Sequence, residues 1–142
     1  MAPEVLDYLG DEYTSSKYTN AVDIWAVGCI IYRLMTGRVP FPPGTSLIKY
    51  CENKSVFPYD ALLDSGTKRG GSEFIRQLLL PNPKDRPPAS QALKHEWILS
   101  GEFLSFYPHS DAPNDPLAIF LSWIPFLKKS LAYLCLAGAL TQ

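Results

Sequence analysis

Residues 19–37 read TNAVDIWAVGCIIYRLMTG, and this stretch predicts one long helix that organises the whole domain. Asn20 can cap the start of the helix, and Asp23 lies in its first turn. Gly37 stands just beyond the predicted end, and Pro40 prevents the helix from continuing. We therefore expect a helix of about five turns at 3.6 residues per turn.

The apolar side chains of this helix cover more than one of its faces. One stripe contains Val27, Ile30, Ile31 and Leu34. Three further side chains point elsewhere: Trp25, Cys29 and Tyr32. A helix that is apolar nearly all round is normally buried on several sides. We expect residues 19–37 to form the buried axis of the domain.

Shorter helices are expected downstream. Thr45 can cap a short helix, and a polar loop is expected to follow through residues 68–71. Ser72 can cap a helix over 73–80, which Pro81 ends, and residues 89–94 are short but helix-prone. No stretch alternates apolar and polar residues well enough to predict a sheet. The expected fold class is mainly α.

Three motifs occur in a fixed order along this chain. The first reads MAPEV at 1–5, and the second reads DIWAVG at 23–28 with Met-Thr-Gly at 35–37. The third reads LLPNPKDRP at 79–87 and is followed by LKHEWI at 93–98. One motif could arise by chance, but three in this order make a specific signal. Together they resemble the C-terminal part of the large lobe of a eukaryotic Ser/Thr-type protein kinase domain, truncated just before the Ala-Pro-Glu motif.

The resemblance assigns structural roles to five residues. Glu4 should pair with Arg86 in bidentate geometry, although both could instead be ordinary surface charges. Asp23 resembles the aspartate that holds the kinase catalytic loop, and a favourable position near a helix N-terminus is an equally good explanation. Trp25 and Gly28 are expected to be a core residue and a close-packing residue.

The residues that perform phosphoryl transfer in kinases are missing from this sequence. It contains no Gly-x-Gly-x-x-Gly, Val-Ala-Ile-Lys, His-Arg-Asp or Asp-Phe-Gly motif. His95 cannot begin a zinc helix of the His-Glu-x-x-His type, because Leu99 stands four positions later. We predict no catalytic, cofactor-binding or metal-binding residue here, with ATP and Mg²⁺ expected only for the complete family domain.

Two functions are compatible with these motifs. The first is a fragment of a Ser/Thr protein kinase, whose family activity is ATP-dependent protein phosphorylation, with no catalysis by the chain alone. The alternative is a non-catalytic binding module derived from a kinase lobe. Both imply protein partners or substrates.

We expect the isolated chain to fold poorly, because Asp23 would lose its hydrogen-bond donors and a buried unsatisfied group costs about 1–3 kcal/mol.

Charge and cysteine content restrict the partners and the compartment. The net charge of the 142 residues is -1 and the basic residues are scattered, so we expect no nucleic-acid binding. The 3 cysteines, Cys29, Cys51 and Cys135, are too few and too widely spaced for a disulfide framework or a zinc site. Reduced thiols and the lack of a secretory signal favour a cytoplasmic or nuclear location.

The composition changes after Trp97. We assign residues 1–98 to the partial kinase domain, 99–116 to a linker, and 117–142 to an apolar tail of unknown role. An apolar block begins at Leu117 and ends at Leu140, but Pro125 and Lys128 interrupt it, which leaves pieces shorter than the roughly 20 residues that span a bilayer. Packing against the lobe is expected, and contact with a membrane surface is the alternative.

Overall fold

The computed structural model describes residues 1–6 and 20–102 of the chain. These residues form helices, turns and loops, and none of them lies in a strand. The prediction of a mainly α fold is confirmed. The chain divides into two compact units, Met1–Pro87 and Pro88–Gln142, and each is described by itself. The predicted tail at 117–142 and most of the predicted linker lie outside the described residues.

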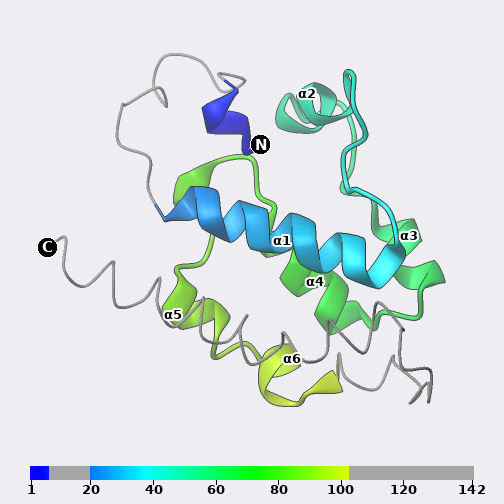
Figure 1. The fold of residues 1–142 in the computed structure, drawn as a ribbon, viewed down its shortest axis with the longest axis vertical. Helices are drawn as coiled ribbons and strands as arrows, with labels where there is room; N and C mark the ends of the chain where they lie inside the picture. Colours follow the sequence, from blue (N-terminus) through cyan, green and yellow to red (C-terminus); the bar gives the residue numbers. More distant parts are fainter. Residues whose placement is uncertain (7–19, 103–142) are drawn as a thin grey trace, which may run out of the picture. The chain divides into compact units, whose positions relative to one another are not determined.

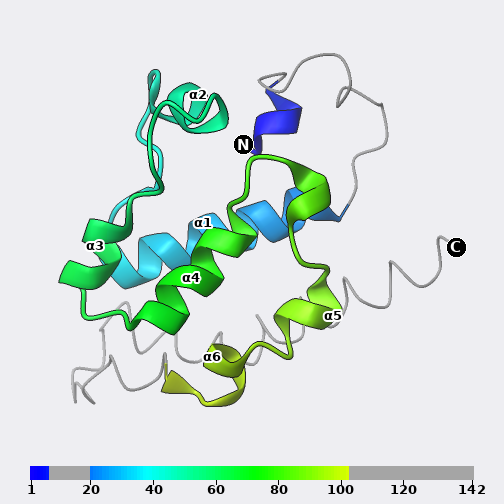
Figure 2. The same cartoon turned by 180° about the vertical axis from the view of Figure 1, so that it is seen from behind.

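The first unit is built around one long helix. Its described elements are η1 Pro3–Val5, α1 Ala21–Thr36, α2 Ser46–Cys51, α3 Tyr59–Asp64, α4 Arg69–Leu78 and η3 Pro83–Asp85. Figure 1 shows α1 crossing the unit, and Figure 2 shows α4 lying against it from behind. α1 also contacts α3 and η3. The prediction that this helix organises the domain is confirmed within this unit.

The two ends of α1 form in different ways. Gly37 follows the last helical residue with a φ of 71°, and its N–H donates to the Arg33 carbonyl at 2.7 Å. A left-handed residue after a helix is best supplied by glycine, so the predicted C-terminal end is confirmed. Asn20 stands at the N-terminal end, but its side chain makes no capping hydrogen bond, so the predicted Asn20 cap is wrong.

The predicted burial of α1 on several sides is also wrong, because one broad face is buried and the other is exposed. The buried residues are Ile24, Trp25, Val27, Gly28 and Tyr32. Four residues on the opposite face are exposed: Asp23, Ala26, Ile30 and Arg33. Ile30, which belongs to the predicted stripe, is 47% exposed. The helix is therefore buried on the face that α4 covers, where residues spaced by four form one row.

The helices between residues 59 and 78 differ from the prediction. α3 was not expected, and α4 begins at Arg69, inside the predicted polar loop. Ser72 is not a cap, because it lies within α4, is buried and donates from Oγ to the Lys68 carbonyl at 3.3 Å. Gly70 and Gly71 lower the helix propensity of the first turn. Burial of Phe74 and other apolar residues of α4 offsets that cost.

The second unit has two short helices among its described residues, α5 Ala89–Ala92 and α6 Glu96–Leu99. α5 matches the predicted helix-prone segment, and α6 was not predicted. His95 caps α6, since its Nδ1 accepts a hydrogen bond from the Trp97 N–H at 3.2 Å. No helix in the described part of the chain is long and apolar enough to cross a membrane.

Candidate functional site

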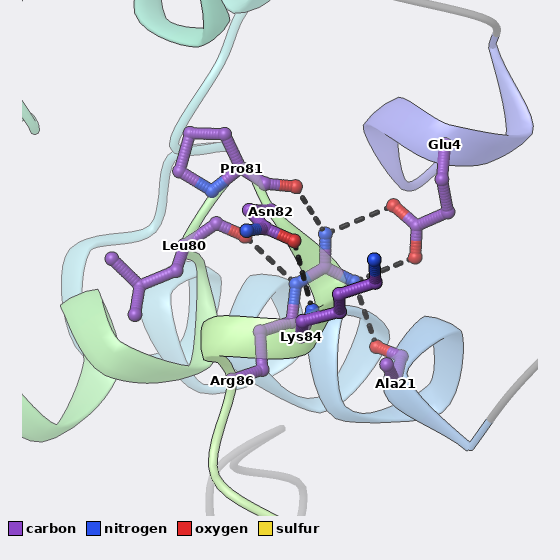
Figure 3. Close-up of polar contacts among 7 residues, drawn as sticks. All are labelled: Glu4, Ala21, Leu80, Pro81, Asn82, Lys84 and Arg86. Atoms are coloured by element: carbon purple, nitrogen blue, oxygen red, sulfur yellow. Dashed lines mark hydrogen bonds and ion pairs between the residues drawn. The ribbon is translucent and has the colours of Figure 1, made fainter. Parts of the chain in front are cut away.

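Two short turns bring together the charged residues that the motifs singled out. Pro3 opens η1, which carries Glu4. Asn82 precedes η3, and its Oδ1 accepts a hydrogen bond from the Lys84 N–H at 3.0 Å. The capped turn ends at Asp85, and Arg86, the next residue, has an extended backbone conformation. This local geometry directs the Arg86 side chain back toward η1 and the start of α1 (Figure 3).

Glu4 and Arg86 form a two-pronged ion pair. Arg86 Nη1 donates to Glu4 Oε1 at 2.7 Å, and Nη2 donates to Oε2 at 2.9 Å. The Arg86 side chain is 0% exposed and the Glu4 side chain is 10% exposed. Parallel N–H···O bonds of this kind are among the strongest polar contacts in proteins. The structure places both groups in the interior, unlike ordinary surface charges.

Main-chain carbonyls occupy the other donors of Arg86. Its Nε donates to the Leu80 carbonyl at 2.7 Å, and Nη2 donates to the Pro81 carbonyl at 2.9 Å. Nη1 also donates to the Ala21 carbonyl at 2.9 Å. A guanidinium has five N–H donors, and each of them has an acceptor here. The buried charge is therefore fully hydrogen-bonded, which removes the main cost of burying it.

Trp25 forms the aromatic wall beside this arginine. The guanidinium carbon of Arg86 lies 4.8 Å from the centroid of the Trp25 ring, and Trp25 is only 2% exposed. The indole stacks on Phe41 at 5.7 Å, which stacks in turn on Tyr50 at 4.7 Å. An arginine over an indole face gains a cation–π attraction. We call Glu4, Arg86, Trp25 and the three carbonyls the arginine clamp, which joins η1, α1 and the segment after α4.

Gly28 allows α1 and α4 to approach closely. A Cβ atom added at this position would lie 2.9 Å from Leu78 Cβ and 2.9 Å from Leu79 Cγ. Both leucines are fully buried. The structure thus gives Gly28 a close-packing role and Trp25 a place in the core.

Replacing Gly28 with alanine is expected to destabilise the chain by about 1–3 kcal/mol, because the helices must separate to admit the methyl group. The matched control is Gly70→Ala in α4, where an added Cβ meets nothing within 4 Å. That variant should be neutral or stabilising by up to about 1 kcal/mol. Urea unfolding followed by circular dichroism measures both. Equal stability of the two variants would show that the α1–α4 contact is loose.

Asp23 lies in the first turn of α1 and is exposed. Because the residue is exposed to solvent, the predicted penalty for a buried and unsatisfied aspartate is wrong for this chain. The reason is that residue 23 falls on the exposed face of α1, together with Ala26 and Ile30. Its position near the helix N-terminus remains favourable. Asp23 therefore gives no reason for the isolated chain to fold poorly.

A second polar cluster was missed at the sequence level. The Tyr59 hydroxyl donates to Glu73 Oε2 at 2.9 Å, and Arg76 Nη2 donates to Glu73 Oε1 at 2.6 Å. Arg76 Nε lies within 3.1 Å of both carboxylate oxygens. The Arg76 hydrogen bonds hold the pKa of Glu73 down to about 2. The Glu73/Arg76 spacing of three residues on α4 was the available signal. We call these three residues the Tyr59 triad.

The Tyr59 triad predicts a specific loss of stability in acid. Because the folded-state pKa of Glu73 is depressed, its stabilising effect is present above the ordinary pKa of 4.5 and is lost as the pH falls toward 2. The Glu73 and Arg76 side chains are 40% and 32% exposed, so the effect should stay below about 1 kcal/mol. The difference in unfolding free energy between the natural chain and Glu73→Gln should shrink over that interval. A difference that is constant from pH 6 to pH 2 would contradict the prediction.

The described residues offer no metal site or activated thiol. Among residues 1–6 and 20–102, no group of three or more His, Cys, Asp or Glu side chains could hold a metal ion. Burial raises the pKa of both Cys29 and Cys51 to about 11. Both thiols are therefore protonated near neutral pH and are weak nucleophiles. The arginine clamp is a structural site whose chemistry is charge pairing.

Comparison with known proteins identifies the family of this chain. The protein kinase domain family matches residues 1–98. The kinase cds1 of Schizosaccharomyces pombe is 31% identical over 118 residues, which cover 77% of this chain and 25% of that protein. Mouse Aurora kinase C is 35% identical over 94 residues, which cover 66% of this chain and 33% of that kinase. The chain thus spans a third or less of these two relatives.

Solved structures give the same result. A crystal structure of the Rad53 kinase domain and SCD2 in complex with AMPPNP matches with a TM-score of 0.54 and 28% identity. The match covers 78% of this chain and 40% of that one. A second Rad53 structure, in complex with AMP-PNP, matches with a TM-score of 0.52 and 34% identity over 66% of this chain and 25% of the other. The helical unit with its Ala-Pro-Glu motif and buried arginine belongs to the protein kinase family.

Proposed function

We propose that this chain supplies the C-terminal helical scaffold of a Ser/Thr protein kinase domain and does not transfer phosphate by itself. The observation that carries the proposal is the arginine clamp. It joins Glu4 of the Ala-Pro-Glu segment to Arg86, which lies 82 positions later in the sequence. Every N–H donor of the guanidinium has an acceptor. A complete kinase domain would use this rigid support to hold its catalytic segments in place.

ATP and Mg²⁺ do not fit the residues present. The sequence has no Gly-x-Gly-x-x-Gly, Val-Ala-Ile-Lys or Asp-Phe-Gly motif. The described residues also contain no cluster of acidic side chains that could hold a cation. We therefore assign nucleotide and metal binding to the complete family domain, and we give the residues of this chain no step in phosphoryl transfer.

Nucleotide binding provides the direct test of this proposal. A ligand that binds only the folded state at 100 times its dissociation constant stabilises that state by about 2.7 kcal/mol. We expect millimolar ATP with Mg²⁺ to leave the melting temperature unchanged, and no phosphate transfer to a general Ser/Thr substrate. An intact Ser/Thr kinase in the same buffer serves as the positive control. A saturable ATP-dependent increase in melting temperature would contradict the proposal.

The reading frame upstream of Met1 tests the fragment interpretation separately. An in-frame Asp-Phe-Gly and His-Arg-Asp in the transcript would support a longer kinase, whose activity would be ATP-dependent protein phosphorylation. An early stop codon upstream would favour the alternative of a short binding module. This observation does not depend on whether the isolated chain folds.

The binding-module alternative has one observation in its favour. Val56, three residues before α3, is 87% exposed, and Leu63, within α3, is 54% exposed. Exposed large apolar side chains can mark contacts with other proteins when they are grouped. A module must fold without further segments, so this function requires a single cooperative thermal transition of the purified chain. A broad, non-cooperative melt would exclude it.

We further propose protein partners and a cytoplasmic or nuclear location. The free thiols of Cys29 and Cys51 support a reducing compartment. The net charge of -1 argues against nucleic acid as a partner. Membrane contact through the block from Leu117 to Leu140 stays a prediction. Vesicle flotation of the chain with and without residues 117–142 would test it. Membrane contact through the tail predicts that the full chain floats with the vesicles and that the shortened chain does not.

A further inference from the structure

The Tyr59 triad, defined above as Tyr59, Glu73 and Arg76, is separate from the arginine clamp. Tyr59 is the first residue of α3, and its ring packs edge-on against Phe57 with centroids 4.9 Å apart. Its hydroxyl reaches across to α4, where Glu73 accepts its hydrogen bond. The phenol oxygen therefore lies beside a carboxylate that is itself held by a guanidinium.

Tyr59 differs in accessibility from the other tyrosines of the described segments. Tyr32 is 2% exposed and donates to the Pro58 carbonyl, while Tyr50 is 8% exposed and donates to the Leu79 carbonyl. Tyr59 is half-buried, and it follows residues 52–58, which form no helix and are exposed from 52 to 56. A modifying enzyme needs an accessible stretch of chain around its target. Of these three tyrosines, Tyr59 is the least buried, and it alone lies within seven residues of the exposed stretch at its N-terminal side without being enclosed in the core.

The charges around Tyr59 determine what a negative group on its oxygen would do. Glu73 is ionised at neutral pH, since its pKa is about 2, and would repel a phosphate. Burial and the neighbouring Glu73 carboxylate raise the pKa of the Tyr59 hydroxyl, and the positive charges of Arg76 and Arg69 oppose that rise. A phosphate carries about 1.5 to 2 negative charges near pH 7 and pairs strongly with guanidinium groups. Glu73 is 40% exposed and can move into water.

We propose that Tyr59 is a phosphorylation site and that its phosphate takes Arg76 away from Glu73. A separate protein tyrosine kinase transfers the γ-phosphoryl group of ATP to Tyr59 Oη. The bond between the γ-phosphorus and the bridging oxygen of ADP breaks, a bond between Oη and phosphorus forms, and the phenol proton passes to the base of that kinase. The contact within α4 between Glu73 and Arg76 is then replaced by an ion pair between α3 and α4. This modification goes beyond the proposed scaffold function.

The first test treats the full chain with a broad-specificity tyrosine kinase and ATP with Mg²⁺, followed by mass-spectrometric mapping of the phosphate. We expect modification at Tyr59 and none at Tyr32 or Tyr50 while the chain is folded. Tyr59→Phe is the matched control, because it keeps the ring and removes the acceptor oxygen. A folded chain that remains unmodified at Tyr59 would overturn the proposal.

The second test measures whether Arg76 leaves Glu73 for the phosphate on Tyr59 in the phosphorylated chain. The pKa of Glu73, followed by NMR of its carboxyl carbon, should rise by about one unit or more when Arg76 leaves it. The second pKa of the phosphate, followed by ³¹P NMR, should be lower in the natural chain than in the Arg76→Gln chain. Circular dichroism checks that this variant remains folded. An unchanged Glu73 pKa after phosphorylation would show that Arg76 keeps its original partner.

Discussion

Replacing Arg86 with alanine is expected to lower the free energy of unfolding by about 3–5 kcal/mol, because it leaves a buried carboxylate without its partner. Glu4 is only 10% exposed on its side chain, so water cannot replace the lost guanidinium without local opening. The carbonyls of Ala21, Leu80 and Pro81 would lose a donor at the same time. The change removes one side chain and disrupts three segments of the unit.

Arg86→Lys is the informative control for this prediction. Lysine keeps the positive charge but cannot offer the planar fork that meets both Glu4 oxygens. Its stability should therefore fall between that of the natural chain and that of Arg86→Ala. Urea unfolding followed by circular dichroism gives the three free energies. A loss of less than about 0.5 kcal/mol in Arg86→Ala, as at ordinary surface positions, would contradict the role of the clamp.

Trp25→Ala is expected to cost about 3–5 kcal/mol, the range for removing a large buried aromatic side chain. The indole is 2% exposed, stacks on Phe41 and covers the guanidinium of Arg86. Its removal leaves a cavity and removes one wall of the clamp. The expected loss therefore combines packing and electrostatics.

Trp25→Phe separates these two contributions. Phenylalanine keeps an aromatic face for Phe41 and fills most of the space, but it gives a weaker cation–π attraction than tryptophan. Its destabilisation should be clearly smaller than that of Trp25→Ala in the same urea experiment. Equal losses in the two variants would mean that the ring face contributes nothing and that only the exact shape of tryptophan is required.

The features that the sequence predicts well are those with a local or motif-based signal. Gly37 marks the end of α1 because a left-handed residue there favours glycine. The pairing of Glu4 with Arg86 came from a resemblance, since no local rule connects residues separated by 82 positions. The close approach at Gly28 came from the same resemblance, and the structure supplies its physical reason in Leu78 and Leu79.

The features that could not be predicted depend on tertiary contacts. The first turn of α4 contains Gly70 and Gly71, which locally favour a loop, and burial of the later apolar residues stabilises the helix. Ile30 is exposed although its neighbours are apolar, because only one face of α1 meets α4. The hydroxyl of Tyr59 reaches Glu73 only after α3 and α4 are placed. None of these outcomes leaves a periodic pattern in the sequence.

A double-mutant cycle on Glu4→Ala and Arg86→Ala tests most directly that the clamp holds this kinase-family unit together. Free energies of unfolding are measured for the natural chain, both single variants and the double variant. We predict a coupling energy of about 2–3 kcal/mol, near the upper end for residues in direct contact. Losses in the single variants that simply add, with a coupling within about 0.5 kcal/mol of zero, would contradict the account.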